Sequence, residues 1–229
     1  SGRWFVIGVL VAGLLVVVAR TVAPWRRDPN RPVRAMYNVI APIYDLWGGE
    51  KGPLATLRRQ LVEMLDLEPG DEVLEVSVGT GANLPYIAAK VGISGRIYGL
   101  DISEGMLAQA RQKLSGMPCP VELRQGLAEE LPYADNSFDA VLHLGGINFF
   151  TDRRRALEEM VRVAKLGARI VVSDETLPSF DGLRALLGRI VLRLVPRLRP
   201  PTELVPHPHP EVRYLGRGYI YAIGWRKAE

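Results

Sequence analysis

Short apolar runs of strand length alternate along most of this chain with stretches in which apolar residues recur every three or four positions. Regular alternation of this kind predicts an α/β fold with a doubly wound, mostly parallel sheet. Ser103 and either Thr151 or Asp152 stand where helix N-caps are expected. The strand-like runs start at residue 73 and lie at 96–100, 121–124, 137–143, 168–173 and 218–225, and the helical patterns lie at 53–65, 83–91, 103–110 and 152–164.

Two segments do not fit this alternation, and the first is the N-terminus. Residues 4–19 carry no charge, and with snorkelling of Arg3 and Arg20 the stretch approaches the roughly 20 residues that span a bilayer. We therefore expect residues 1–23 to anchor the chain in the membrane and 24–35 to form a basic linker. The arginines that follow the anchor place the rest of the chain in the cytoplasm under the positive-inside rule. A cleaved signal peptide and a buried core helix are the alternatives.

The second unusual segment is 180–199, where leucine, isoleucine and valine recur at helical spacing between arginines, with Asp181 as the only acid. A basic amphipathic helix is typical of a segment that lies on a membrane surface. The same apolar stripe would suit a helix that crosses over the sheet, and both interpretations hold if the helix lies at the edge of the domain. We expect a single globular domain over 36–229 with the bilayer as a partner.

Composition narrows the class of protein further. The chain has 229 residues, which is enough for one α/β domain with an appendage. Its net charge of +4 suits anionic lipid or nucleic acid, but the basic residues stand beside apolar stripes rather than between aromatic residues, so we expect no nucleic-acid partner. Cys119 is the single cysteine, so no intramolecular disulfide forms. His207 and His209 alternate with prolines and have no third ligand nearby, so we expect no metal site.

Candidate chemistry gathers at the end of the first strand. Glu75 precedes a turn with Gly79 and Gly81, and Asp101 ends the second strand. A strand, a glycine turn and a helix bring the backbone close to a nucleotide, and an acid at the end of the second strand accepts hydrogen bonds from ribose hydroxyls. Ser77 stands where the dinucleotide fingerprint has its first glycine, and the Glu75 carboxylate would repel a pyrophosphate. The pattern excludes NAD and favours a zwitterionic ligand with a cationic amino group.

Three successive motifs carry a family resemblance. They are EVSVGTG at 75–81, GLDISEGML at 99–107 and GLAEELPYADNSFD at 126–139. In this order they resemble the motifs of class I S-adenosylmethionine-dependent methyltransferases, over about residues 37–175. The resemblance implies S-adenosylmethionine as the cofactor. It also implies a Rossmann-like sheet of seven strands, or six if the short region before the last strand forms none, with the final strand antiparallel.

The same resemblance implies roles for single residues around the cofactor. It places Glu75, Ser77, Gly79, Thr80 and Gly81 at the methionine part, Asp101 at the ribose hydroxyls, and Ile102, Met106, Ala128 and Glu129 around the adenine. His143 is a further candidate for cofactor binding, as a strand-end histidine hydrogen-bonded to the lid or to the cofactor carboxylate.

The acceptor side is implied by a narrower resemblance. Tyr37 and Tyr44 stand in a segment similar to the one that covers the cofactor in ubiquinone and menaquinone C-methyltransferases and in bacterial phosphatidylethanolamine N-methyltransferases. By that resemblance Tyr44 faces the methyl-transfer site, and Tyr37 and Asn148 line the acceptor pocket. His143, at the end of the fourth strand, is either a general base or a structural histidine.

These features together predict a membrane-anchored enzyme that methylates a lipid-like acceptor. We expect a phospholipid amine first, as in phosphatidylethanolamine N-methylation. The alternatives are C- or O-methylation of an isoprenoid quinone precursor and S-methylation of a small hydrophobic thiol. An alternative of another class is a non-catalytic membrane tether that binds the cofactor.

Overall fold

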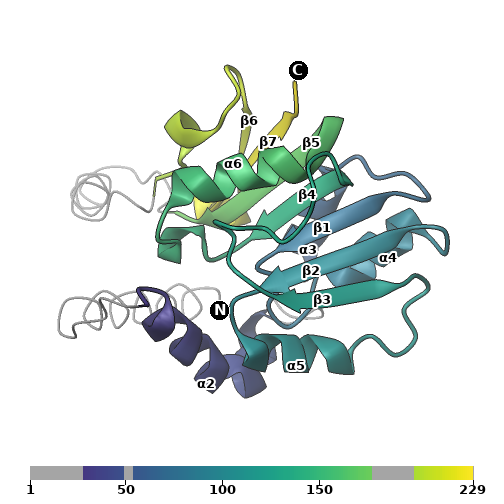
Figure 1. Ribbon diagram of the computed structural model, residues 1–229, viewed down its shortest axis with the longest axis vertical. Coiled ribbons are helices and arrows are strands. Elements are labelled where there is room, and N and C mark those ends of the chain that lie inside the picture. The colour runs from purple at the N-terminus through teal and green to yellow at the C-terminus, as the bar shows by residue number, and fades with distance from the viewer. Residues whose placement is uncertain (1–27, 49–53, 177–198, 229) are drawn as a thin grey trace.

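The computed structural model describes residues 28–48, 54–176 and 199–228, which are drawn in colour in Figure 1. The expected membrane anchor at 1–23 and almost all of the expected amphipathic helix at 180–199 lie outside the described residues. Within the described ranges, we find no helix that combines the length and the apolar character needed to cross a membrane.

Seven strands form one sheet in the order β3-β2-β1-β4-β5-β7-β6 (Figure 1). Strands β1 to β5 run parallel, and β7 is antiparallel to both of its neighbours, β5 and β6. The structure confirms the mostly parallel sheet with a final antiparallel strand and fixes the number of strands at seven. The bounds are β1 Glu72–Val76, β2 Arg96–Asp101, β3 Val121–Gln125, β4 Phe138–Leu144, β5 Ala164–Glu175, β6 Glu211–Leu215 and β7 Ile220–Arg226.

Strand β6 is the one whose existence the sequence left open. Among the described strands it pairs with β7 alone, and all five of its residues keep some exposure to solvent. An edge strand of this kind needs no continuous apolar run, and charged side chains on it prevent pairing with other chains. The sequence Glu-Val-Arg-Tyr-Leu therefore lacks the pattern that marks the buried strands.

Helices cover both faces of the sheet. Figure 1 shows α6 in front of the sheet and α3 and α4 behind it. The helices are α3 Ala55–Glu63, α4 Leu84–Val91 and α5 Glu104–Gln112 around one apolar core, and α6 Arg153–Val163 at the other.

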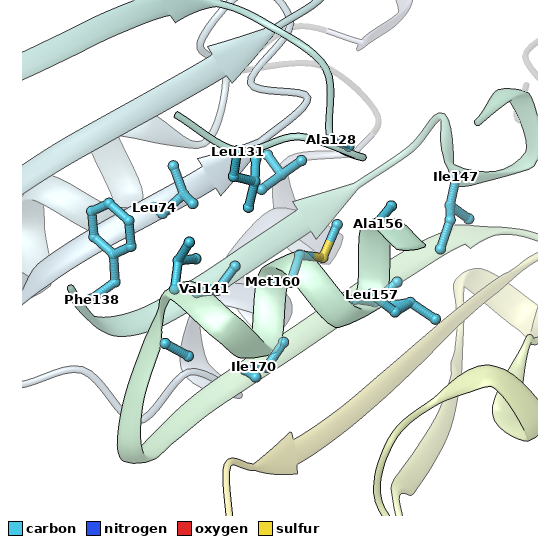
Figure 2. Packing of buried hydrophobic residues seen from close by; sticks show 14 of the residues in the cluster. Leu74, Ala128, Leu131, Phe138, Val141, Ile147, Ala156, Leu157, Met160 and Ile170 are labelled. Carbon is cyan, nitrogen blue, oxygen red and sulfur yellow. The ribbon is translucent and has the colours of Figure 1, made fainter. Parts of the chain in front are cut away.

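Consecutive residues of the central strands belong to different cores. Val73 packs into the core of α3, α4 and α5, whereas Leu74 packs into the core of α6. In the same way, Leu142 and Val141 of β4 face opposite sides. Figure 2 shows Met160 of α6 over the strands of its core. Because both faces are buried, the strands read as near-continuous apolar runs, which made them recognisable in the sequence.

The helix caps are set by local hydrogen bonds. The Ser103 hydroxyl accepts a hydrogen bond from the Met106 N–H at 3.1 Å, which confirms the predicted cap of α5. Asp152, one of the two candidates for α6, is its cap, because its carboxylate accepts from the Arg155 N–H at 3.0 Å. Strand β5 begins at Ala164, earlier than the predicted 168, since α6 runs directly into it.

Helix α2 (Arg31–Gly48) lies beside α5, and both run along the lower edge of the domain in Figure 1. It begins inside the segment 24–35 that we expected to be a linker. The side-chain oxygen of Asn38 accepts a hydrogen bond from Ser103 Oγ at 2.7 Å and another from the Gly105 N–H at 2.9 Å. A Cβ atom at Gly105 would lie 3.0 Å from Asn38 Cα, so a larger residue there would force the two helices slightly apart.

The Leu157→Ala substitution tests the packing of α6. Leu157 is fully buried, so we expect the free energy of unfolding to fall by about 2–5 kcal/mol in urea denaturation. Leu166→Ala is the matched control, because Leu166 is 61% exposed and should change stability by less than about 0.5 kcal/mol. Equal losses in the two variants would contradict this packing.

Candidate active site

A pocket lies at the carboxyl edge of the parallel strands, between the sheet and α2. It is open to solvent and holds about 660 Å³ of empty space, part of which belongs to that open solvent. Glu75, Thr80, Gly81, His143 and Asn148, all of which the sequence singled out, are not among its lining residues. The predicted residues that do line it are Tyr37, Tyr44, Ser77, Gly79, Asp101, Ile102, Met106, Ala128 and Glu129.

The turn after β1 is held in the left-handed region of the backbone. Ser77, Gly79 and Gly81 have φ values of 60°, 56° and 75°. Gly81 also has no room for a side chain, since a Cβ there would lie 2.8 Å from Leu84 and 3.2 Å from Ala110. Ser77 adopts a conformation that is uncommon for a residue with a side chain, at the point where the dinucleotide fingerprint has glycine. The turn keeps its shape despite the missing first glycine.

Asp101 connects this turn to the start of α5. One carboxylate oxygen accepts from the Gly79 N–H at 2.8 Å, and the other accepts from the Ser103 N–H at 2.8 Å. Burial raises the pKa of Asp101 to about 6, although these backbone N–H groups act in the opposite direction. The carboxylate lines the pocket and keeps lone pairs for a ligand, because a carboxylate can accept about four hydrogen bonds.

Glu75 lies outside the pocket lining, in a buried chain of polar groups. Its Oε1 accepts from Asn83 Nδ2, and Asn83 Oδ1 in turn accepts from Arg58 Nη1 at 2.7 Å. Within the part of the chain that the structure describes, Oε2 has no hydrogen-bond partner. Burial raises the pKa of Glu75 to about 7, against the effects of Asn83 and Arg58. A cationic ligand nearby would therefore favour its ionised form.

Thr80 connects the glycine turn to α2 and does not face the pocket. Its hydroxyl donates to the Asp45 carboxylate of α2, and Asp45 also forms an ion pair with Lys113, just beyond α5. The turn, α2 and α5 are thus joined by side chains far apart in the sequence. We predicted Thr80 as a cofactor residue, and in the structure its hydroxyl contacts Asp45 and so positions α2 beside the pocket.

Glu129 lines the pocket, but its carboxylate is already engaged. Oε1 accepts hydrogen bonds from the N–H groups of Thr151 at 2.8 Å and Asp152 at 3.3 Å, at the start of α6. The Thr151 hydroxyl in turn donates to the side chain of Asn30, which also lines the pocket. Glu129 therefore holds the loop before α6 against the pocket. The side on which we expected the adenine is lined by Ile102, Met106 and the residues that precede Glu129.

The opposite side of the pocket is aromatic. Tyr37, Tyr44, Phe149 and Phe150 line it, and the rings of Tyr37 and Phe149 meet edge to face at 6.2 Å. Burial raises the pKa of Tyr44 to about 12, and the charge of Glu175 adds to this effect. Burial also raises the pKa of Tyr37 well above its usual value, with Tyr44 and Glu175 as further causes. Both phenols are protonated at neutral pH and can donate hydrogen bonds.

His143 is fully buried outside the pocket lining. Its Nδ1 lies 3.0 Å from the Val76 carbonyl oxygen, so this nitrogen carries the proton and donates. Burial lowers the pKa of His143, which keeps the imidazole neutral. The Phe150 ring, which lines the pocket, lies 5.1 Å from the imidazole. This position favours the structural interpretation of His143 over the general base.

We expected the Asn148 side chain to line the acceptor pocket, but Asn148 is not a lining residue, and its backbone N–H makes a hydrogen bond instead. Its N–H donates to Asp174 Oδ2 at 3.1 Å, and Asp174 Oδ1 accepts from the Glu175 N–H at 2.8 Å. Sequence reasoning passed over Asp174 and Glu175 as site residues, although both end the fifth strand at the sheet edge where the other strand-end acids lie. Burial, and then Asp174, raise the pKa of Glu175 well above its usual value.

Comparisons with known proteins agree with this geometry. The family described as "Methyltransferase domain" matches residues 74–172. The demethylmenaquinone methyltransferase of Desulfitobacterium hafniense is 34% identical over 178 residues, covering 74% of this chain and 69% of the relative. That of Bacillus mycoides is 38% identical over 128 residues, covering 56% and 54%.

Solved structures show the same fold at lower identity. Phosphoethanolamine N-methyltransferase 2 of Haemonchus contortus aligns with a TM-score of 0.60 at 17% identity, over 78% of this chain and 43% of that one. A putative methyltransferase of Haloferax volcanii, solved with its activator, aligns with a TM-score of 0.62 at 15% identity, over 84% and 98%. Likeness at this level of identity concerns the fold alone.

The strand order, the glycine turn and Asp101 define a nucleotide-binding enzyme of the Rossmann-like class. Together with the relatives above, they show that this chain belongs to the class I S-adenosylmethionine-dependent methyltransferases.

The residues of the pocket fit S-adenosylmethionine, which supplies a methyl group on a cationic sulfur when it is bound. Asp101 would accept hydrogen bonds from ribose hydroxyls, and Ile102 and Met106 would flank the adenine. Gly79, whose left-handed backbone leaves open space where a side chain would stand, allows a ligand close to the turn. The unpaired buried oxygen of Glu75 fits a site that receives a cation.

The Asp101→Asn variant should bind cofactor more weakly. An amide has a single acceptor oxygen, so one backbone hydrogen bond is lost along with the charge. We expect the affinity for S-adenosylhomocysteine in calorimetry to fall about 10- to 100-fold. Glu104→Gln, which removes an exposed carboxylate of α5, is the control and should leave the affinity unchanged. Affinity of Asp101→Asn within about twofold of the unmodified chain would contradict the assignment.

The Glu75→Gln variant should change how stability depends on pH. Folding raises the pKa of Glu75 from 4.5 to about 7, so the folded state binds more protons and stability falls as the pH rises between these values. Glutamine does not titrate and keeps an oxygen for Asn83. The variant should therefore gain about 2–3 kcal/mol relative to the unmodified chain between about pH 5 and pH 8 in urea denaturation. A difference that stays constant with pH would contradict this.

Proposed function

We propose that this methyltransferase methylates a ring carbon of an isoprenoid quinone precursor at a membrane surface. The demethylmenaquinone methyltransferases at 34% and 38% identity support this acceptor. They favour the quinone alternative over the phospholipid amine that we expected first from the sequence.

The character of the acceptor wall is the observation that carries the proposal. Tyr37, Tyr44, Phe149 and Phe150 offer flat apolar surface and phenolic donors, which suits an aromatic ring with oxygen substituents. Among the described residues that line the pocket there is no lysine or arginine. A phospholipid would bring a phosphate into the site, and a buried phosphate needs a cationic partner. The wall therefore supports a quinol ring over a phospholipid head.

The acceptor carbon must be electron-rich, and loss of a ring hydroxyl proton makes it so. Burial and Asp174 raise the pKa of Glu175 above its usual range, so this carboxylate has a raised affinity for a proton. It also lies within electrostatic range of Tyr37 and Tyr44, whose phenols line the pocket. In this proposal the ionised Glu175 carboxylate, which lies outside the pocket lining, takes up the hydroxyl proton, the phenols orient the ring oxygens, and the ring C–H proton is released once the methyl group is in place. His143 would keep the strand end in place through Val76.

The bilayer belongs to the same proposal. An isoprenoid tail keeps the acceptor in the membrane, so the enzyme must work at its surface. The uncharged sequence at 4–19, the arginines that follow it and the basic pattern at 180–199 support a membrane anchor with the catalytic domain in the cytoplasm. In this arrangement the cofactor comes from the aqueous side and the acceptor from the lipid side.

The test is a paired assay with the full chain in lipid vesicles and S-adenosylmethionine carrying a labelled methyl group. One vesicle preparation contains a reduced naphthoquinone with an isoprenoid tail and no ring methyl group, and the other contains phosphatidylethanolamine. We expect label on the ring carbon, read by product mass and fragmentation, and none on the phospholipid. The Asp101→Asn variant controls for methylation by a contaminant.

Other results would replace the proposal. Label on the amine would restore the phospholipid assignment. Bound cofactor without turnover of either lipid, or of a hydrophobic thiol added in parallel, would indicate the non-catalytic tether.

A further inference from the structure

Helix α2 presents three different faces around its axis. Successive residues turn by about 100°, so Val33, Tyr37 and Tyr44 fall on one face, and these residues line the pocket. Asn38, which is bonded to the start of α5, lies about 100° further round. The third face is turned away from both, roughly opposite the pocket.

This third face is apolar and exposed. Val39, Ile43 and Leu46 stand at i, i+4 and i+7, and their side chains are 78%, 46% and 73% exposed. Ala35 and Pro42 are exposed on the same side. Asp45, the one charged residue of α2 between Ala35 and Leu46, has a side chain that is 38% exposed, but it falls on the side of Asn38 and is paired with Lys113. A helix face that meets water normally carries charged residues, so this face requires an explanation.

The size and the sequence context of this face favour lipid as its occupant. A stable dimer interface takes about 800 Å² and some 20–30 residues from each partner, far more than one row of three apolar side chains offers. A narrow apolar stripe on a helix is what an element lying in the plane of a membrane interface presents. The sequence that leads into α2 carries the uncharged stretch 4–19 and then Arg20, Arg26 and Arg27, which suits an anionic bilayer.

We propose that the face of α2 formed by Val39, Ile43 and Leu46 docks into the headgroup–acyl boundary of an anionic bilayer. The value of this docking for catalysis rests on the proposed function, in which the acceptor is a membrane lipid. The pocket face of the same helix would then lie about one helix diameter, ~10 Å, from the lipid. An acceptor ring could pass around α2 into the pocket while its tail stays in the bilayer.

Docking of α2 on a membrane would also account for the several side-chain contacts that hold this helix to the rest of the domain. Asn38 holds it to α5, and Asp45 holds it to the glycine turn and to Lys113. A helix that bears on a membrane on one side and forms the pocket wall on the other must be fixed to keep the wall in place. Docking of the face would therefore orient the whole pocket relative to the bilayer.

Fluorescence quenching in vesicles tests the docking directly. In the full chain with the buried Cys119 replaced by alanine, single cysteines at Ile43→Cys and Leu46→Cys carry an environment-sensitive fluorophore. Lys90→Cys is the matched control, exposed at the end of α4. With phosphatidylcholine–phosphatidylglycerol vesicles whose acyl chains bear nitroxide quenchers, we expect strong quenching at 43 and 46 and little at 90.

Equal quenching at all three positions would overturn the proposal. A change in fluorescence at 43 and 46 that depends on protein concentration and needs no vesicles would also overturn it, in favour of self-association.

A second variant separates docking from the catalytic proposal. Val39→Gln with Leu46→Gln keeps good helix formers on an exposed face, so folding should be preserved. We expect turnover of a long-tailed quinol in vesicles to fall about tenfold or more, and turnover of a short-tailed soluble analogue to stay unchanged. Unchanged turnover of both would overturn the docking. If the unmodified chain turns over neither acceptor, the proposed function fails, and the quenching experiment still decides the docking.

Discussion

The structure depends on one carboxylate, that of Asp101, which holds two backbone segments together. One oxygen takes the N–H of Gly79 in the turn after β1, and the other takes the N–H of Ser103 at the start of α5. These two hydrogen bonds add to those of Val78 and Gly81 in the turn and to the Ser103 cap of α5, and they join the two segments to one another. This arrangement buries an acidic group, which is unfavourable for its charged form and raises the pKa of Asp101. The same residue presents its remaining lone pairs to the pocket.

The parts of the site extend outward from this point. Ser103 caps α5, and its hydroxyl also meets Asn38, which brings α2 over the pocket. Thr80 of the turn donates a hydrogen bond to Asp45 of α2, which gives α2 a second connection to the cofactor side of the pocket. The glycine turn beside the pocket and the Tyr37 and Tyr44 side of its aromatic wall are therefore positioned by the same small group of hydrogen bonds. A membrane-facing surface on α2 would be coupled to the pocket through these contacts.

The features that the sequence predicted well are those encoded locally. Buried strands are recognisable as apolar runs, and in the motif around Asp101 the hydrogen bonds that begin α5 join residues close in sequence.

The features that the sequence did not predict depend on contacts between distant residues or on competing signals. Pro42 interrupts the helical pattern of α2, although the helix continues through it. Thr80 and Glu129 were assigned to the cofactor by resemblance, and their hydrogen bonds to α2 and to the start of α6 require the folded chain. Glu175 does end a strand beside the other acids, but its proximity to Tyr37 and Tyr44 of α2 can be seen only in the folded chain.

Hydrogen exchange with and without S-adenosylmethionine tests most directly whether α2 and the cofactor turn act as one unit. The account predicts that the cofactor slows amide exchange together in the turn at 77–81, at 101–106 and along α2 at 31–48, since Asn38 and Asp45 join these segments. Slower exchange at 77–81 and 101–106 with unchanged exchange along α2 would contradict it.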